Sequence, residues 1–167
     1  MQLAELNQLS PAQRKEELTK CCGASAWVEG MNRLFPFQEK SELLQQADRV
    51  WNSLSPKDWL EAFTHHPKIG DVHSLKEKFA STAKWASGEQ ASVQQASEQV
   101  IEQLAEDNKA YEEKFGYIFI VCATGKPAEE MLMLLHKRLL NKAEEEIRIA
   151  AAEQAKITKI RLEKLLA

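Results

Sequence analysis

Residues 141–167, NKAEEEIRIAAAEQAKITKIRLEKLLA, decide the fold class of this chain. Asn141, followed by Glu144 three residues later, predicts an N-cap that separates this helix from another over residues 131–140. Apolar residues then recur at the spacing of an amphipathic helix, at Ile147, Ala150, Ala151, Ile157, Ile160, Leu162 and Leu165. We therefore expect a long final helix with one face in the core.

Helix signals continue toward the N-terminus. Ser10 and Ser55 each precede a proline, which is the pattern of a capping serine followed by Pro at the first helical position. The helix that starts after Ser55 must end near His65, because Pro67 disfavours helical geometry at the residue before it. Two further helical pieces are expected between these signals, one from Ser25 to the region of Pro36 and one over residues 41–51.

The middle of the chain carries weaker signals. Residues 68–88 are polar and contain two glycines, which predicts a partly helical loop. Glu89 opens a long helix that ends at Phe115 and Gly116. Residues 117–123 form a compact apolar run, either a strand-like segment or a buried helical piece. The expectation is one all-α domain over residues 1–167, a bundle of about eight helices with at most one short strand-like segment.

Composition excludes several classes of partner. The chain has 167 residues, 44% of them hydrophobic and 28% charged, which is an ordinary globular balance. Its formal net charge of -3 gives no global basic field, so neither nucleic acid nor an anionic membrane is expected as a partner. A small anion remains a possible ligand, because binding sites depend on local charge.

The cysteines and the first residues bear on the cellular compartment. There are three cysteines, and the adjacent Cys21 and Cys22 are poor disulfide partners. The first residues lack a basic-then-apolar signal layout, and no apolar run approaches the length of a membrane span. We expect a cytoplasmic protein in a reducing environment.

His65-His66-Pro67 is the most informative local motif. A histidine at the end of a helix, fixed by a following proline, has little backbone freedom and an imidazole that exchanges protons near neutral pH. A histidine at this place also serves commonly as a helix cap, and from these residues alone that simpler role is the more frequent one. The motif therefore makes His66 a candidate, with the capping role left open.

Two other places carry candidate binding groups. Glu89 and Gln90 stand at an expected helix start, where free backbone N–H groups and polar side chains suit a ligand with several amides. Arg161 lies in a nearly apolar stretch, and its planar fork suits a carboxylate. Ordinary first-turn acid placement and a solvated arginine are the structural alternatives at these two places.

Several motifs of other classes are incomplete. Residues 123–126 end in Gly-Lys but lack the earlier glycine of a phosphate-binding loop. The cysteines and histidines do not have zinc-finger spacing, and the chain contains no Glu-x-x-His pair. No metal site is expected.

The order of the blocks along the chain resembles the 2-oxo-4-hydroxy-4-carboxy-5-ureidoimidazoline decarboxylase family. Residues 63–70 (FTHHPKIG) resemble its histidine–proline motif, and residues 85–90 (WASGEQ) its Glu-Gln motif. Residues 115–123 (FGYIFIVCA) match a third block, and pieces of residues 6–37 and 138–162 complete the set. The resemblance spans nearly the whole chain, and five ordered blocks are more specific than any one alone.

This resemblance implies an all-helical bundle, often a homodimer, that decarboxylates the ureidoimidazoline to (S)-allantoin in urate degradation without a cofactor. It implies His66 and Glu89 as catalytic residues. Many family members have serine where this chain has Ala86, so Ser87 or a water would have to supply that hydroxyl contact. The implied substrate contacts are Pro67, Ala86, Ser87, Gly88, Glu89, Gln90, Phe119, Ile120, Val121, Cys122, Ala123 and Arg161.

The family function requires three remote stretches to meet: His66, the Glu89–Gln90 doublet and Arg161 should converge on one cavity. Two other classes compete with it. A non-catalytic helical interaction module would use the long C-terminal helix as a partner surface and would tolerate changes at all three places. A metal-dependent hydrolase would lose activity with a chelator.

Overall fold

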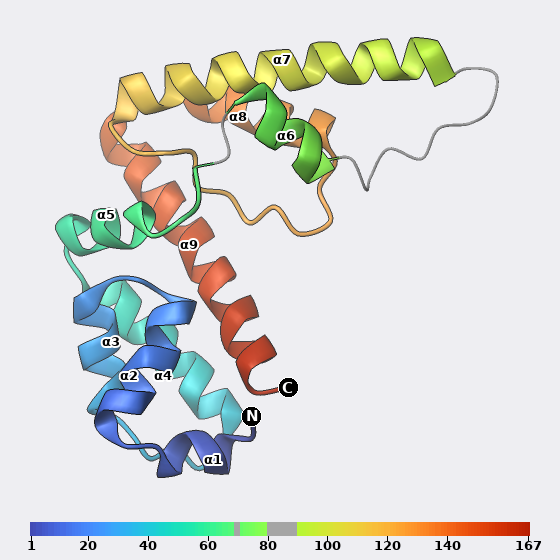
Figure 1. Ribbon diagram of the computed structural model, residues 1–167. Coiled ribbons are helices and arrows are strands. Elements are labelled where there is room, and N and C mark those ends of the chain that lie inside the picture. Colours follow the sequence, from blue (N-terminus) through green and yellow to red (C-terminus); the bar gives the residue numbers. More distant parts are fainter. Residues whose placement is uncertain (69–70, 80–89) are drawn as a thin grey trace. The chain divides into compact units, whose positions relative to one another are not determined.

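The computed structural model describes residues 1–68, 71–79 and 90–167, with the backbone alone at residues 78 and 90–97 (Figure 1). This part of the chain contains helices and no strands, so the expected all-α class is confirmed. Nine helices are present there, against the expected number of about eight. They are α1 (Leu3–Gln8), α2 (Pro11–Cys21), α3 (Ser25–Asn32), α4 (Lys40–Ser53), α5 (Pro56–Thr64), α6 (Val72–Phe79), α7 (Gln90–Phe115), α8 (Ala128–Leu139) and α9 (Ala143–Leu165).

Contacts divide the chain into two compact units. Unit 1 comprises Met1–His66 with Ile147–Ala167, and unit 2 comprises Pro67–Glu146. The division falls within α9, so the first turn of that helix belongs to unit 2 and the remainder to unit 1. Each unit is described below by itself.

The two predicted serine starts are confirmed in unit 1. The Ser10 hydroxyl accepts a hydrogen bond of 3.2 Å from the Gln13 backbone N–H, which satisfies an otherwise unpaired donor at the start of α2. At the start of α5, the Asp58 carboxylate accepts from the backbone N–H of Ser55 at 3.2 Å and from its hydroxyl at 3.0 Å. These contacts lie within four residues of each other, which is why the local sequence predicts them.

Indole groups hold the helices of unit 1 together. Trp27 of α3 is fully buried and donates from Nε1 to the Ala47 carbonyl of α4 at 3.1 Å. Trp51 of α4 donates to the Ala151 carbonyl of α9 at 2.9 Å. Each indole therefore buries a large apolar area and still satisfies its one donor, and the contacts tie α3 to α4 and α4 to α9.

Unit 2 is built on the long helix α7, against which α6 and α8 pack (Figure 1). The start and end of α7 agree with the expected helix from Glu89 to Phe115 within one residue. Helix α6 confirms that residues 68–88 are partly helical. The buried core of this unit consists of Leu75, Phe79, Ile101, Leu104, Tyr111, Ala128, Met131 and Leu135.

Residues 117–123 lie between α7 and α8 as a segment that is neither helix nor part of a sheet. Of the two expectations for this run, the buried helical piece is wrong. Gly116 (φ 83°) and Gly125 (φ 74°) stand on either side of it, both in the left-handed region that disfavours residues with a Cβ. The two glycines thus fix where the chain leaves α7 and where it turns toward α8.

The predicted N-cap at Asn141 is wrong, although the predicted break between two helices is right. Helix α9 begins at Ala143, and the Lys142 carbonyl accepts from the backbone N–H of Glu146 at 2.9 Å. The Asn141 amide instead donates to Oε2 of Glu146 at 2.9 Å. The Asn141 side chain, which the local pattern assigns to the helix cap, is therefore hydrogen-bonded to the Glu146 side chain five residues later.

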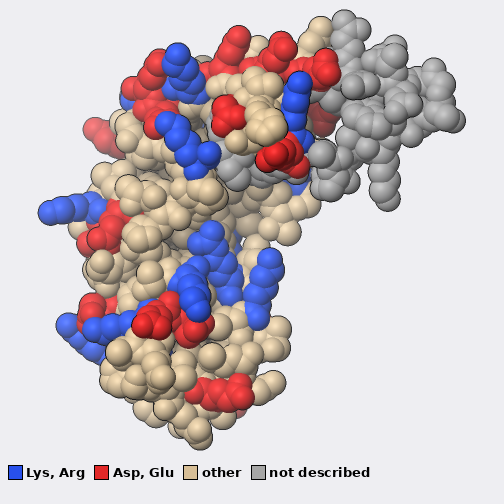
Figure 2. Space-filling model, viewed as in Figure 1, with Lys and Arg blue, Asp and Glu red and all other residues tan. Residues whose placement is uncertain are grey.

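The surface carries charges of both signs. Lys and Arg side chains are interspersed with Asp and Glu over the face seen in Figure 2, in keeping with the small net charge. Among the described residues, no helix has both the length and the apolar character needed to cross a bilayer.

Candidate active site

His66 stands just beyond the end of α5. The last turn of this helix tightens, with the His65 N–H donating to the Ala62 carbonyl at 3.1 Å and the His66 N–H to the Phe63 carbonyl at 3.3 Å. Phe63 is buried and anchors this turn in the core of unit 1. The backbone that carries the imidazole is therefore held on both sides, by the core and by Pro67.

The backbone of Gly23 packs directly against His65. A Cβ added to Gly23 would lie 2.3 Å from Cγ of His65 and 2.7 Å from its Cβ, which no real side chain tolerates. Only glycine permits this approach, so Gly23 helps to set the position of the α5 terminus and of the neighbouring His66.

The imidazole of His66 meets a buried amide of α9. Its Nε2 forms a short hydrogen bond with Oε1 of Gln154, whose side chain is 1% exposed. Gln154 Nε2 then donates to Oγ1 of Thr158 at 3.0 Å. Half-buried His66 is thereby joined to two buried polar groups of one helix.

Burial lowers the pKa of His66 below its ordinary value, because desolvation penalises the imidazolium. The hydrogen bond with Gln154 opposes this shift, whereas the coulombic effects of Arg161 and His65 add to it. The imidazole is therefore neutral at pH 7, as a general base must be.

Arg161 lies on the same helix, two turns after Gln154. Its Nη1 donates to the Cys21 carbonyl at 3.4 Å, and its charge acts on Cys21, Cys22 and His66. Burial nevertheless raises the pKa of both thiols to about 11, so they are protonated at neutral pH and are packing groups, not nucleophiles. The guanidinium thus contributes a positive charge from α9 to the surroundings of His66.

In unit 2, a buried ion pair holds the irregular segment at residues 117–123. Arg138 donates from Nη1 to the Ile120 carbonyl at 2.5 Å, and from Nε to Oε1 of Glu146 at 2.6 Å. Tyr111 donates its hydroxyl to the same carboxylate oxygen at 2.6 Å. The guanidinium also lies 4.5 Å from the centre of the Phe119 ring. Arg138 therefore fixes both the backbone and a side chain of the segment.

The second cation on this segment is Lys126, which donates to the Cys122 carbonyl at 2.6 Å. Ile120 and Cys122 are buried, and their neighbours in the segment are half-buried. This irregular segment is thus stabilised by side-chain donors to its carbonyls, not by a sheet.

The structure places the predicted site residues in three groups. His66 and Arg161 lie near each other in unit 1. Their contact with substrate stays a prediction, and so does a cavity shared with the other predicted site residues. Unit 2 contains the predicted contacts Phe119, Ile120, Val121, Cys122 and Ala123. Pro67, which is exposed, is the first residue of this unit. Ala86, Ser87, Gly88 and Glu89 lie outside the described residues, as does the side chain of Gln90 at the start of α7. Convergence of the three groups stays a prediction.

Sequence reasoning missed the polar residues that surround the candidates. The most buried positions of α9 recur every four residues and include Glu146, Gln154 and Thr158, whereas the apolar pattern pointed to half-buried Ile157 and Ile160. The signal was present in the sequence: these polar residues share the four-residue register of Ala150 and Leu162. A search for apolar residues alone does not find it.

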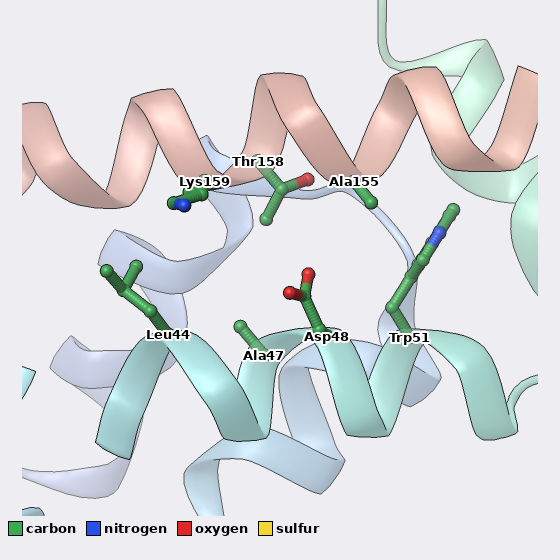
Figure 3. A pocket seen from close by; sticks show the side chains of 7 residues that line it. All are labelled: Leu44, Ala47, Asp48, Trp51, Ala155, Thr158 and Lys159. Atoms are coloured by element: carbon green, nitrogen blue, oxygen red, sulfur yellow. The ribbon is translucent and has the colours of Figure 1, made fainter. Parts of the chain in front are cut away.

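A small hollow lies between α4 and α9, with Thr158 in its lining (Figure 3). Asp48 of α4 points across it toward α9. The hollow has room for about one water molecule, which is too little space for a ureidoimidazoline. Its lining residues are Leu44, Ala47, Asp48, Trp51, Ala155, Thr158 and Lys159.

Comparisons with known proteins agree on one family. The model of a family described as OHCU decarboxylase matches residues 7–163. The uric acid degradation bifunctional protein TTL of Arabidopsis thaliana is 36% identical over 151 residues, which are 90% of this chain and 47% of that protein. The 2-oxo-4-hydroxy-4-carboxy-5-ureidoimidazoline decarboxylase of Haloferax volcanii is 24% identical, over 96% of this chain and 93% of the other.

A solved structure gives the same answer for the fold. The crystal structure of an OHCU decarboxylase in the presence of (S)-allantoin is similar with a TM-score of 0.72 and 36% identity, over 90% of this chain and 97% of that one. The chain spans about half the length of the Arabidopsis relative, which is a bifunctional protein by name.

Proposed function

The chain belongs to the OHCU decarboxylase family, and from that membership we propose that it converts 2-oxo-4-hydroxy-4-carboxy-5-ureidoimidazoline to (S)-allantoin. The reaction is the last step from urate to allantoin, and it needs no cofactor or metal in this proposal. The observation that carries the proposal is half-buried His66, whose imidazole meets buried Gln154 and whose pKa is lowered by burial and by the Arg161 guanidinium.

The substrate itself supplies the electron sink. The bond between the hydroxyl-bearing ring carbon and its carboxylate breaks, carbon dioxide leaves, and the electron pair of the broken bond forms a double bond to the adjacent ring carbon. The electrons of the ring C=N bond move onto nitrogen, which takes a proton from solvent. Loss of the hydroxyl proton and protonation of the ureido-bearing carbon then give the ketone of allantoin. The protein is left with two tasks: orientation of the breaking bond and delivery of a proton to one face.

His66 performs the proton transfer in this proposal. As a neutral base it takes the hydroxyl proton, and as an imidazolium it delivers a proton to the ureido-bearing carbon. Its lowered pKa suits both steps, because the imidazolium that forms is a stronger acid than an ordinary histidine. Protonation from one side only explains a single enantiomer.

The other groups orient the substrate. Arg161 holds an anionic edge through its planar fork. Glu89 and Gln90 fix the ureido and ring amides, with Glu89 as the second catalytic residue, and Pro67 and residues 86–88 complete that side. Main-chain groups of residues 119–123 supply the remaining contacts, supported by the anchoring of this segment through Arg138.

We also propose a cytoplasmic homodimer, as the family resemblance implies. Three free, buried cysteines suit a reducing compartment. Sedimentation of the purified chain should give twice the mass of 19.0 kDa; a monomer at all concentrations would contradict the dimer without bearing on the reaction.

The experiment that tests the reaction is optical. Freshly prepared urate-oxidation product is followed by circular dichroism with and without the protein, because spontaneous decay gives racemic allantoin. We expect the protein to speed the appearance of optically active allantoin. An interaction module would leave both the rate and the optical activity at the uncatalysed level, and that result would reject the proposed function.

A further inference from the structure

The side chain of Gln154 is placed where a second-layer partner of His66 would stand. It is 1% exposed, and both ends of its amide are used, with Oε1 toward His66 and Nε2 on Thr158. A buried amide whose donors and acceptor are satisfied cannot rotate without leaving polar groups unpaired. The orientation of this amide is therefore a property of the core of unit 1.

The direction of the protons follows from how the Gln154 amide is oriented. Its Nε2 donates to Oγ1 of Thr158 at 3.0 Å, so Thr158 is an acceptor in this contact. The amide NH2 thus faces Thr158, and the amide oxygen Oε1 faces Nε2 of His66. An oxygen accepts only, so the proton between the two side chains belongs to Nε2 of His66.

We propose that Gln154 is a positioning residue that holds neutral His66 in the Nε2–H tautomer, so that Nδ1 is the atom that accepts the proton in the reaction. This inference rests on the proposed function for its catalytic meaning. The tautomer itself follows from the contacts of Gln154 with His66 and Thr158 and can be measured in the absence of substrate. Removal of an orienting partner leaves the imidazole free to adopt the other tautomer, in which Nδ1 has no lone pair.

Nitrogen NMR of the histidine-labelled protein tests the tautomer. The chain has 4 histidines, and the His66→Asn variant identifies the signals of His66. Above its pKa, wild-type His66 should show a protonated Nε2 and an unprotonated Nδ1. In Gln154→Met, which keeps the length of the side chain but accepts no such hydrogen bond, both tautomers should appear.

Kinetics of the same variants separate positioning from packing. Gln154→Met should lower kcat about tenfold or more with KM changed less than twofold, because orientation of the base fails and substrate contacts remain. Thr158→Val should have the same effect in weaker form, and Thr158→Ser should restore wild-type behaviour. Lys164→Met, an exposed change on the same helix, is the matched control and should alter neither quantity.

A wild-type spectrum with the proton on Nδ1 overturns the inference, whether or not any variant folds. An unchanged tautomer in Gln154→Met overturns it as well. If instead the wild-type protein does not speed allantoin formation while His66 is held as Nε2–H, the proposed function fails and the role of Gln154 in fixing the tautomer stands.

Discussion

Arg138 donates to the main-chain carbonyl of Ile120, so a buried guanidinium on α8 holds the irregular segment between α7 and α8. The same guanidinium pairs with Glu146, whose side chain is fully buried. We expect Arg138→Met to destabilise the protein by about 3–5 kcal/mol, because it leaves the carboxylate of Glu146 charged and without its cation. Chemical denaturation followed by circular dichroism measures this change.

The matched control for this prediction is Lys137→Met, an exposed neighbour that should change the free energy of unfolding by less than about 0.5 kcal/mol. The double variant Arg138→Met/Glu146→Gln should be less destabilised than the sum of its two single changes, since it removes both charges. Strict additivity would show that the pair does not act as a unit.

His66→Asn should lower kcat by about 10²–10⁴-fold, the usual contribution of a positioned acid–base group. The control is His73, whose side chain on α6 is 83% exposed. The His73→Asn variant should have wild-type turnover. Both variants are assayed by the optical appearance of allantoin. Wild-type turnover by His66→Asn would remove this residue from the chemistry.

In a plot of kcat/KM against pH, the midpoint of the acidic limb should lie below pH 6.5, the ordinary pKa of histidine. Burial, together with Arg161 and His65, lowers the pKa of His66, so the neutral base persists to more acidic pH than a free imidazole. Arg161→Met removes one positive charge that disfavours the imidazolium. The limb should therefore move to higher pH in this variant, in addition to any loss of substrate binding.

A pH–rate profile of the wild type and Arg161→Met checks both statements. An acidic limb above pH 6.5 in the wild type, or a shift to lower pH in the variant, would contradict the assignment of the limb to His66.

Gly23→Ala should destabilise unit 1 by about 1–3 kcal/mol, the usual cost of overpacking. The added methyl group would lie 2.3 Å from Cγ of His65, so the end of α5 must move and carry His66 with it. We expect kcat to fall together with the denaturation midpoint. His65→Ala in the same chain removes the two closest atoms and should recover part of the stability; no recovery would place the strain elsewhere.

The sequence predicts best those features whose causes are local. The starts of α2 and α5 follow from Ser10 and Ser55, because each cap is satisfied by a residue three positions away. Asn141 shows the opposite case, since its amide is taken by Glu146 and the helix begins elsewhere. The irregular segment at residues 117–123 was ambiguous for the same reason: its carbonyl partners, Arg138 and Lys126, lie outside it.

The residues of the candidate site also differ in whether the sequence alone points to them. His66 and Arg161 are candidates because blocks of the family resemblance carry them; both lie in unit 1, and their roles stay a prediction. Gln154 could not be predicted from hydrophobic periodicity, because it is a polar residue at a core position whose partner is 88 positions away in the sequence. Such a residue is recognised only once the pairing of helices is known.

The residues that α9 contributes near His66 lie on one side of the helix. Gln154, Thr158 and Arg161 are separated by four and three residues, so they project from one side of the helix. One residue inserted between Gln154 and Arg161 would swing the guanidinium by about 100° relative to the amide. We therefore expect substitutions on the outer side of α9 to be tolerated better than an insertion or deletion within this interval.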